Sequence, residues 1–371
     1  MSKILVIIGT RPEAIKMAPV IMELKKRKLQ HIVVSTGQHR EMLREMLKVF
    51  KIKPDYDLDI MSREQSLFDI TIKVLAKIRS VYENEKPSLV LVQGDTLSSF
   101  ISGLAAFYQK IPIGHVEAGL RTYNKYYPFP EEISRELIDI LADYYFTPTE
   151  LTKQNLLREG KSRDKIYVTG NTVVDALLTI DKEKKRLFNN PSLNRLDFSK
   201  KIILVETHRR EIWGNVMGKI HKALRIIAEK NQDIVIVFLV HKNPIVRKSA
   251  ESYLKNHPRI ILVESLDYFD LIKVLKICYF IITDSGGLQE EAPTFGKPVL
   301  IVRRETERLE GINSGIAKLI GLDSKHLIKQ AEFLIRDKNQ YRVMSSKHNP
   351  YGDGKAAQRI VNIIARKIIH L

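Results

Sequence analysis

Short apolar runs recur along this chain of 371 residues, and longer segments with helical spacing of apolar residues separate them. Such unbroken runs are typical of strands buried on both faces, because a strand with one wet face alternates apolar and polar residues. Strands alternating with helices indicate doubly wound parallel sheets. The runs predict strands at 4–8, 32–35, 89–92, 111–116, 144–147, 166–168, 202–205, 234–240, 260–263, 279–283 and 299–302.

The length of the chain favours two domains, since a single core rarely extends beyond about 250–300 residues. The same strand–helix scheme occurs in both halves, and the polar segment 182–201 is the best candidate for a linker. Ligands of open α/β sheets bind beyond the carboxyl ends of the strands. We therefore expect an α/β protein with two doubly wound domains and a site in the cleft between them.

Composition excludes several classes of function. The one cysteine, Cys278, lies in an apolar run, and neither C-x-x-C nor H-E-x-x-H occurs, so we expect no disulfide and no metal. No apolar run is long enough to span a membrane, and the first run is too short for a signal sequence, which predicts a cytoplasmic protein. The net charge of +18 is spread along the chain without a nucleic-acid-binding module, so we expect no nucleic-acid partner.

The stretch GTRPEAIKMAP (9–19) predicts the end of the first strand and the start of a helix. Thr10 and Glu13 have the spacing of a capping box, and Pro12 suits a first helical turn. Arg11 is unexpected there, because the N-terminus of a helix already carries partial positive charge. Its presence predicts a bound anion.

Ionisable residues follow several of the predicted strands: Asp95, Glu117, Glu131, His208 and His241. Each has a structural alternative when taken alone. Asp95 could cap a helix, Glu131 could favour a helix dipole, and His208 could be a buried, hydrogen-bonded histidine. Because carboxyl ends of parallel strands meet at one edge of a sheet, the whole set indicates a site.

The segment DSGGLQEEAP (284–293) predicts a binding loop for a diphosphate. Ser285, Gly286 and Gly287 lie between a predicted strand and a helix start, where backbone N–H groups can hold phosphate. Glu291, one turn later, could accept hydrogen bonds from two ribose hydroxyls or simply match the helix dipole. The order is not that of a Walker A loop, and no G-x-G-x-x-G opens the first domain.

The motifs GTRPEAIKMAP, GDT, HVEAGLRT, PEE, HRRE, VHKNP, DSGGLQEEAP, GKPVL, TER and NPYGDG follow one another in this order. In this the chain closely resembles the non-hydrolysing UDP-N-acetylglucosamine 2-epimerases over nearly its whole length. The resemblance implies a GT-B fold with domains at 1–172 and 173–355, and a C-terminal helix (356–371) that packs back onto the first domain. It also implies a homodimer in polysaccharide biosynthesis that interconverts UDP-N-acetylglucosamine and UDP-N-acetylmannosamine without a cofactor.

The resemblance also assigns roles to individual residues. It implies substrate contacts for Arg11, Lys16, His241, Ser285, Gly286, Gly287, Glu291 and Arg308, and a catalytic group of Asp95, Glu117, Glu131 and His208. The anion predicted from Arg11 would then be the UDP-sugar. One departure from the family pattern precedes His208, where Glu206 and Thr207 replace a Thr-Gly or Thr-Ala pair.

The chemistry of this epimerisation explains why several acids are needed. Carbon 2 bears an acetamido group, so elimination of UDP with loss of the carbon-2 proton, followed by re-addition to the glycal, is the accessible path. We expect Asp95 and Glu131 to move the proton, and Glu117 and His208 to assist the departing UDP. The alternatives are a retaining GT-B glycosyltransferase, a UDP-sugar-binding protein and a hydrolysing relative.

Many bacterial relatives bind a second UDP-N-acetylglucosamine as an activator. Here Gln38, His39 and Gln65 match that site, but Glu41 and Glu64 replace a glutamine and an arginine. Acids beside a diphosphate are unfavourable, so we expect activation that is weakened or differently built. Initial rates should follow a hyperbola in substrate concentration without added activator, and a sigmoid curve would contradict this prediction.

Overall fold

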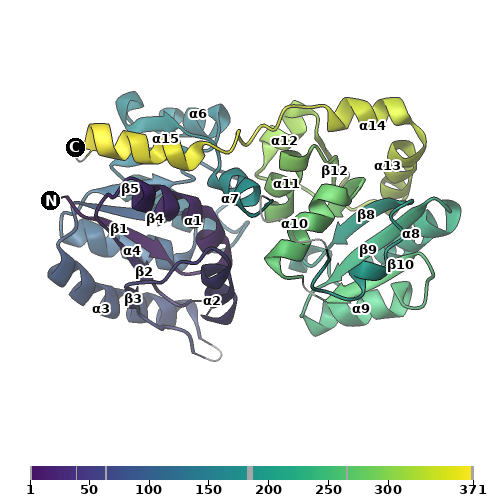
Figure 1. Ribbon diagram of the computed structural model, residues 1–371, viewed down its shortest axis with the longest axis horizontal. Helices are drawn as coiled ribbons and strands as arrows, with labels where there is room; N and C mark the ends of the chain where they lie inside the picture. The colour runs from purple at the N-terminus through teal and green to yellow at the C-terminus, as the bar shows by residue number, and fades with distance from the viewer. Residues whose placement is uncertain (1, 39, 63–64, 182–186, 265, 369–371) are drawn as a thin grey trace. The chain divides into compact units, whose positions relative to one another are not determined.

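The computed structural model describes residues 2–38, 40–62, 65–181, 187–264 and 266–368. The chain divides into two compact units, which are treated separately below. Unit 1 comprises Met1–Thr179 and Tyr351–Leu371, and unit 2 comprises Ile180–Pro350. Figure 1 shows a parallel sheet with helices on both faces in each unit.

Unit 1 is built on a sheet with the strand order β3-β2-β1-β4-β5-β6-β7 among its described residues. Its strands are β1 (Ile4–Ile8), β2 (His31–Ser35), β3 (Tyr56–Asp57), β4 (Leu89–Gln93), β5 (Ile113–Val116), β6 (Tyr144–Thr147) and β7 (Ile166–Val168). Its helices are α1 (Arg11–Lys26), α2 (Arg40–Val49), α3 (Leu67–Glu85), α4 (Leu97–Tyr108), α5 (Glu131–Leu141), α6 (Glu150–Arg158), α7 (Thr172–Asp181) and α15 (Ala356–Ile363), with a 3₁₀ turn at Arg163–Lys165 and a π-helical turn at Ile364–Ile368.

Unit 2 has the strand order β10-β9-β8-β11-β12-β13 within the described part of the chain. Its strands are β8 (Lys201–Glu206), β9 (Ile234–Val240), β10 (Ile260–Glu264), β11 (Phe280–Thr283), β12 (Val299–Ile301) and β13 (Ala317–Leu319). Its helices are α8 (Asn215–Lys230), α9 (Pro244–Leu254), α10 (Tyr268–Ile277), α11 (Gly286–Glu291), α12 (Leu309–Ser314), α13 (Ser324–Arg336) and α14 (Lys338–Ser345), with 3₁₀ turns at Leu193–Arg195, Arg210–Ile212 and Ala292–Phe295.

Both sheets are wholly parallel and doubly wound, so the predicted fold class is confirmed. In each sheet the chain first winds to one side of the starting strand and then returns to the other side. The reversal lies between β1 and β4 in unit 1, and between β8 and β11 in unit 2. Such switch points are where open α/β sheets hold their ligands.

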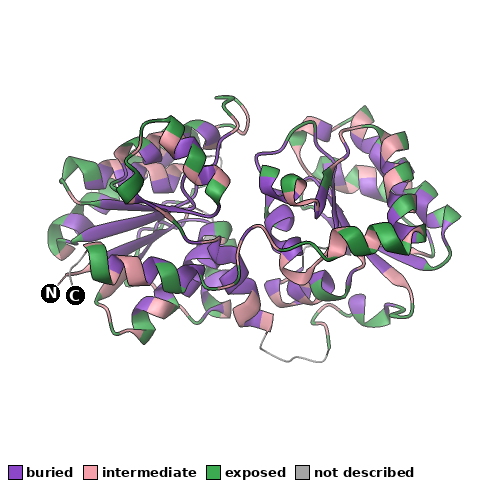
Figure 2. Ribbon diagram, turned by 90° about the horizontal axis from the view of Figure 1, so that it is seen from above, coloured by how far each residue is buried: buried purple, intermediate pink, exposed green. Residues whose placement is uncertain are grey.

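The cores follow from the apolar strands. Every residue of β1, β4, β9 and β11 is buried, as two-sided coverage by helices requires. The helices that cover them are amphipathic, and Figure 2 shows buried strands inside each unit beneath helices with exposed outer faces. All predicted strands are present. The edge strands β3 and β13 were not predicted.

The C-terminal helix α15 belongs to unit 1, where it lies against α1. Asp175 of α7 accepts hydrogen bonds from the backbone N–H groups of Ala356 and Ala357, at 3.1 and 2.9 Å. It thereby satisfies two of the unpaired donors at the start of α15. Arg27, at the end of α1, donates to Asn362 of α15.

The interpretation of 182–201 as a linker needs correction where the structure describes it. Residues 182–186 lie outside the described residues. Beyond them, Leu193 and Leu196 are buried in the core of unit 2, and Asp270 accepts from the backbone N–H groups of Asn189 and Asn190. The polar composition concealed two core leucines. Among the described residues no helix combines the length and hydropathy needed to cross a bilayer.

Candidate functional site

The carboxylate of Glu13 joins the two loops at the switch point of unit 1. Its Oε2 accepts from the backbone N–H groups of Gly9 and Thr10, both at 2.6 Å, as the capping-box spacing predicted. Its Oε1 accepts from the hydroxyls of Thr96 and Ser99, at 2.5 and 2.6 Å. Glu13 is 1% exposed, so these four donors replace its hydration. The loop that bears Arg11 is thereby fixed to the loop that follows Asp95.

Lys16 and Glu117 come together, although 101 residues separate them in the chain. The Lys16 ammonium donates to Oε2 of Glu117, and the Asn171 side chain donates to the same oxygen at 3.1 Å. Both partners of the ion pair are buried. Arg11 is only partly buried and has no side-chain hydrogen bond or ion pair within the described part of the chain. It is the cation of this loop that is available to an anion.

Glu117 has a backbone conformation that costs energy. Its φ is +70°, a left-handed value that glutamate rarely adopts. Such residues cost roughly 1–3 kcal/mol and are concentrated at functional sites. The backbone N–H of Glu117 donates to the Phe146 carbonyl at 2.9 Å, which helps to hold this conformation.

Asp95 lies directly after β4 and does not cap a helix, since Thr96 is the N-cap of α4. Its Oδ2 accepts from the Arg135 guanidinium at 2.5 Å. Arg135 is buried on α5, one turn after Glu131. Glu131 is the first residue of α5 and is partly buried, whereas its neighbour Glu132 is fully buried and accepts from two backbone N–H groups.

His208 lies after β8, at the switch point of unit 2, and its side chain is 27% exposed. The buried Asp284 accepts from the backbone N–H groups of His208 and Arg209 at 2.8 and 2.9 Å. The other Asp284 oxygen lies 3.5 Å from His208 Nδ1, and Glu206 lies 3.9 Å from the same nitrogen. The His241 ring stacks on His208 with centroids 4.9 Å apart. Burial, reinforced by His208, lowers the pKa of His241.

The loop Ser285–Gly287 opens α11 at the other strand of this switch point. Gly286 and Gly287 are its first two residues, and their N–H groups have no partner within the helix. A side chain at Gly286 would bring its Cβ to 3.1 Å from the guanidinium carbon of Arg308. The predicted contact Arg308 therefore lies directly against the loop. Glu291, predicted to bind ribose, ends α11 and is buried.

Arg308 belongs to an alternating series of buried charges. Its guanidinium donates to Glu307 and, at 3.0 Å, to Glu290 of α11. Glu307 also accepts from Arg303 at 2.8 Å, and Arg303 donates to Glu211 at 3.1 Å. Arg303 is fully buried. Because Glu211 follows the His208 loop, this series fixes that loop, the Arg308 loop and α11 to one another.

The residues predicted from the activator site are only partly described. His39 and Glu64 lie outside the described residues. Gln38 accepts from the Ser98 hydroxyl at 2.6 Å, and Gln65 accepts from the Ser62 backbone N–H at 3.1 Å. Glu41 is exposed in the first turn of α2.

Sequence reasoning missed three residues that hold the candidate site together: Arg135, Asp284 and Arg303. Asp284 had a usable signal in the sequence, because it directly follows β11 and immediately precedes Ser285. Arg135 and Arg303 had none, since their partners Asp95 and Glu211 are 40 and 92 residues away.

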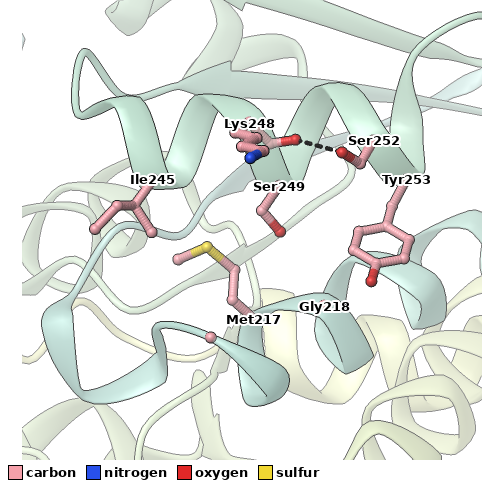
Figure 3. Close-up of a pocket in the computed structure, with 8 residues that line it drawn as sticks. Met217, Gly218, Ile245, Lys248, Ser249, Ser252 and Tyr253 are labelled. Atoms are coloured by element: carbon pink, nitrogen blue, oxygen red, sulfur yellow. Dashed lines mark hydrogen bonds between the residues drawn. The ribbon is translucent and has the colours of Figure 1, made fainter.

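A surface cavity of about 290 Å³ lies in unit 2 between α8 and α9 (Figure 3). Its lining residues are Gly214, Met217, Gly218, Ile245, Lys248, Ser249, Ser252 and Tyr253. None of them is a predicted site residue. Within the described ranges, no group of three or more His, Cys, Asp or Glu side chains is arranged to hold a metal ion.

Comparison with known proteins gives a consistent picture. Residues 22–365 match the family model of UDP-N-acetylglucosamine 2-epimerase. The chain is 47% identical to the UDP-N-acetylglucosamine 2-epimerase of Campylobacter jejuni over 98% of its own length and 97% of the relative. It is 46% identical to that of Escherichia coli K12 over the full length of both. The crystal structure of UDP-GlcNAc 2-epimerase from Neisseria meningitidis bound to UDP-GlcNAc superposes with a TM-score of 0.92 at 42% identity, covering 98% of this chain and 100% of that one.

Substitution of Arg303 by methionine should destabilise unit 2 by about 3 kcal/mol, because it leaves the buried carboxylate of Glu307 and the partly buried carboxylate of Glu211 undercompensated. Trp213, the single tryptophan, lies in unit 2, so its fluorescence during urea unfolding reports on this unit. Arg225→Met is the matched control, since the contacts of Arg225 with Glu229 and with the Tyr253 carbonyl are exposed and the substitution should cost less than about 0.5 kcal/mol. If the two substitutions lowered the free energy of unfolding equally, the charge series around Arg303 would contribute no more to stability than an exposed ion pair does.

Proposed function

The chain belongs to the UDP-N-acetylglucosamine 2-epimerase family, and we propose that it interconverts UDP-N-acetylglucosamine and UDP-N-acetylmannosamine by eliminating UDP and adding it back to a glycal. The observation that carries this proposal is the placement of Asp95, Glu117 and Glu131 in the segments that follow two neighbouring strands of the first sheet, β4 and β5, at one edge of that sheet. Such a group suits a reaction that removes a proton from carbon and returns it to the other face.

The proposed elimination breaks two bonds and forms them again. A base takes the proton from carbon 2 while the anomeric carbon–oxygen bond breaks, and the electron pair of the former C–H bond becomes the glycal double bond. UDP leaves with the electron pair of the broken carbon–oxygen bond. Re-addition of UDP, with a proton delivered to the opposite face of carbon 2, gives the epimer. Nothing is oxidised overall, so the balance needs no redox cofactor.

We assign proton transfer at carbon 2 to Asp95 and Glu131. Arg135 supports this assignment, because it lies one turn after Glu131 on α5 and binds Asp95 directly. Glu131 and the Arg135 partner of Asp95 therefore lie on the same helix, α5, which fixes the position of one carboxyl group relative to the other. Two acids are needed because a single group would return the proton to the same face of carbon 2 from which it removed it, and the configuration would not change.

We assign stabilisation of the departing UDP to Glu117, His208 and the cations around them. Lys16 already forms an ion pair with Glu117, so its positive charge is largely balanced before substrate binds. Arg11 is the available cation near the start of α1, and the Gly286 and Gly287 N–H groups suit the diphosphate. Glu291 would bind the ribose. Arg308 and His241 would contribute further contacts to the same substrate.

We also infer that the chain acts as a homodimer in the cytoplasm and supplies UDP-N-acetylmannosamine for polysaccharide biosynthesis. These inferences rest on the family resemblance and on the substrate. Activated nucleotide sugars are donors for glycosyl transfer, so the product must be consumed by a transferase or by an enzyme that modifies the sugar.

The first experiment is proton NMR of the purified chain with UDP-N-acetylglucosamine in deuterated water. We expect loss of the carbon-2 proton signal and growth of a UDP-N-acetylmannosamine spectrum. Free N-acetylmannosamine with UDP would replace the proposal with a hydrolysing reaction. An intact nucleotide sugar without exchange would contradict it and favour a glycosyltransferase.

Asp95→Asn and Glu131→Gln should each slow epimerisation by at least about 100-fold, because each removes a proton-transfer group. Glu136→Gln is the matched control, since Glu136 lies on the same helix and has no assigned role; its rate should stay within about twofold of the unaltered chain. The readout is deuterium incorporation at carbon 2, which reports proton transfer separately from product release. Unchanged incorporation in both active-site variants would overturn the assignment.

A further inference from the structure

A fully buried pair, His115 and Asp139, lies in unit 1, which also carries the proposed catalytic carboxylates of Asp95, Glu117 and Glu131. His115 is in β5 and Asp139 is on α5, and neither side chain has any exposed surface. One Asp139 oxygen lies 2.6 Å from His115 Nδ1. The other accepts from the Gly119 backbone N–H at 3.2 Å and pairs with the Arg121 guanidinium at 2.7 Å.

Two contacts of this pair end close in the chain to residues of the proposed catalytic group. His115 Nε2 lies 2.8 Å from the carbonyl oxygen of Gly94, the residue immediately before Asp95. Gly119 follows Glu117 by two residues. Asp139 itself lies eight residues after Glu131 on the same helix, about 12 Å along its axis.

Both ring nitrogens of His115 have partners. A carbonyl oxygen can only accept, so Nε2 donates to the Gly94 carbonyl. Nδ1 faces the Asp139 carboxyl group. Burial alone raises the pKa of Asp139, but His115 and Arg121 outweigh burial and lower it below the usual range.

The peptide units that this pair contacts have little freedom of their own. The Gly94 N–H donates to the Val116 carbonyl at 3.0 Å, so Gly94 is held at both its donor and its acceptor. Gly119 has a φ of +85°, and a Cβ there would lie 2.3 Å from the Thr152 carbonyl oxygen. Only glycine allows this loop to approach Asp139 and α6 so closely.

We propose that His115 and Asp139 are positioning residues that fix the loops of Asp95 and Glu117 relative to the helix of Glu131. The proposal rests on the epimerase function proposed above. Because Asp95 and Glu131 are assigned the proton transfers and Glu117 the departing UDP, a shift of either loop moves one of these groups relative to the others. A displacement of about 1 Å in such a geometry lowers a rate by about 100-fold.

Two substitutions of His115 separate its two contacts. Glutamine can place an amide N–H near the position of Nε2 and so donate to the Gly94 carbonyl, whereas asparagine can replace only Nδ1 toward Asp139. We expect His115→Asn to lower kcat by about 100-fold with KM within about threefold, and His115→Gln to recover at least about tenfold of that loss. UDP affinity should be unchanged in both, because neither substitution alters the Ser285–Gly287 loop of unit 2 or the side chain of Arg11.

Tyr82→Phe is the matched control for lost stability. The buried Tyr82 hydroxyl donates to the Ser102 carbonyl at 2.9 Å between α3 and α4, so the substitution removes a buried hydrogen bond in the same unit. It should lower the melting temperature and leave kcat within about twofold. A second measurement uses the unaltered chain: proton spectra of the chain labelled with ¹⁵N-histidine should show one ring whose N–H proton exchanges slowly with water, because it is buried and donates to the Gly94 carbonyl.

These measurements separate failure of this proposal from failure of the proposed function. If the unaltered chain does not epimerise, the proposed function is wrong, and this proposal falls with it. If it epimerises, equal losses in His115→Asn and His115→Gln, unchanged kcat in both, or a His115 N–H proton that exchanges rapidly with water would overturn the positioning role.

Discussion

The buried carboxylate of Glu13 is the interaction on which the arrangement of the first unit's loops depends. It joins the loop after β1 to the loop after β4 through four hydrogen bonds, across the point where the winding of the sheet reverses. Water cannot replace these donors, because the residue is almost wholly enclosed. These hydrogen bonds hold the ends of β1 and β4 and the starts of α1 and α4 in one geometry. Arg11 and Asp95 therefore lie at the same edge of the sheet.

The strands could be predicted from sequence wherever they are buried on both faces. The pattern failed for β3 and β13, which are two and three residues long, lie at the sheet edges and carry exposed positions. The candidate site divides in a similar way. Residues directly after strands, such as Asp95 and His208, could be selected because topology brings those ends together. Their supporting partners could not, because the pairing of Arg135 with Asp95 depends on how α5 lies over the sheet.

Buried charge is used in both units to hold loops in place. In unit 2 the series Glu211, Arg303, Glu307, Arg308 and Glu290 alternates in sign and joins three segments. A buried ion pair contributes little net stability against a well-packed apolar alternative, because desolvation offsets most of the attraction. What such pairs supply is geometry, since each has one acceptable arrangement. The His115–Asp139 pair in unit 1 is built in the same way, and both sets lie under loops that carry proposed site residues.

The cation at the start of α1 can now be understood from its surroundings. A helix N-terminus disfavours Arg11, and Glu13 relieves part of that cost while spending its hydrogen bonds on backbone and hydroxyl donors. Lys16, one turn later, is neutralised by Glu117. The local acids are therefore committed elsewhere, and Arg11 retains a charge that no described side chain compensates. The anionic substrate proposed above would supply the compensating charge at the start of this helix.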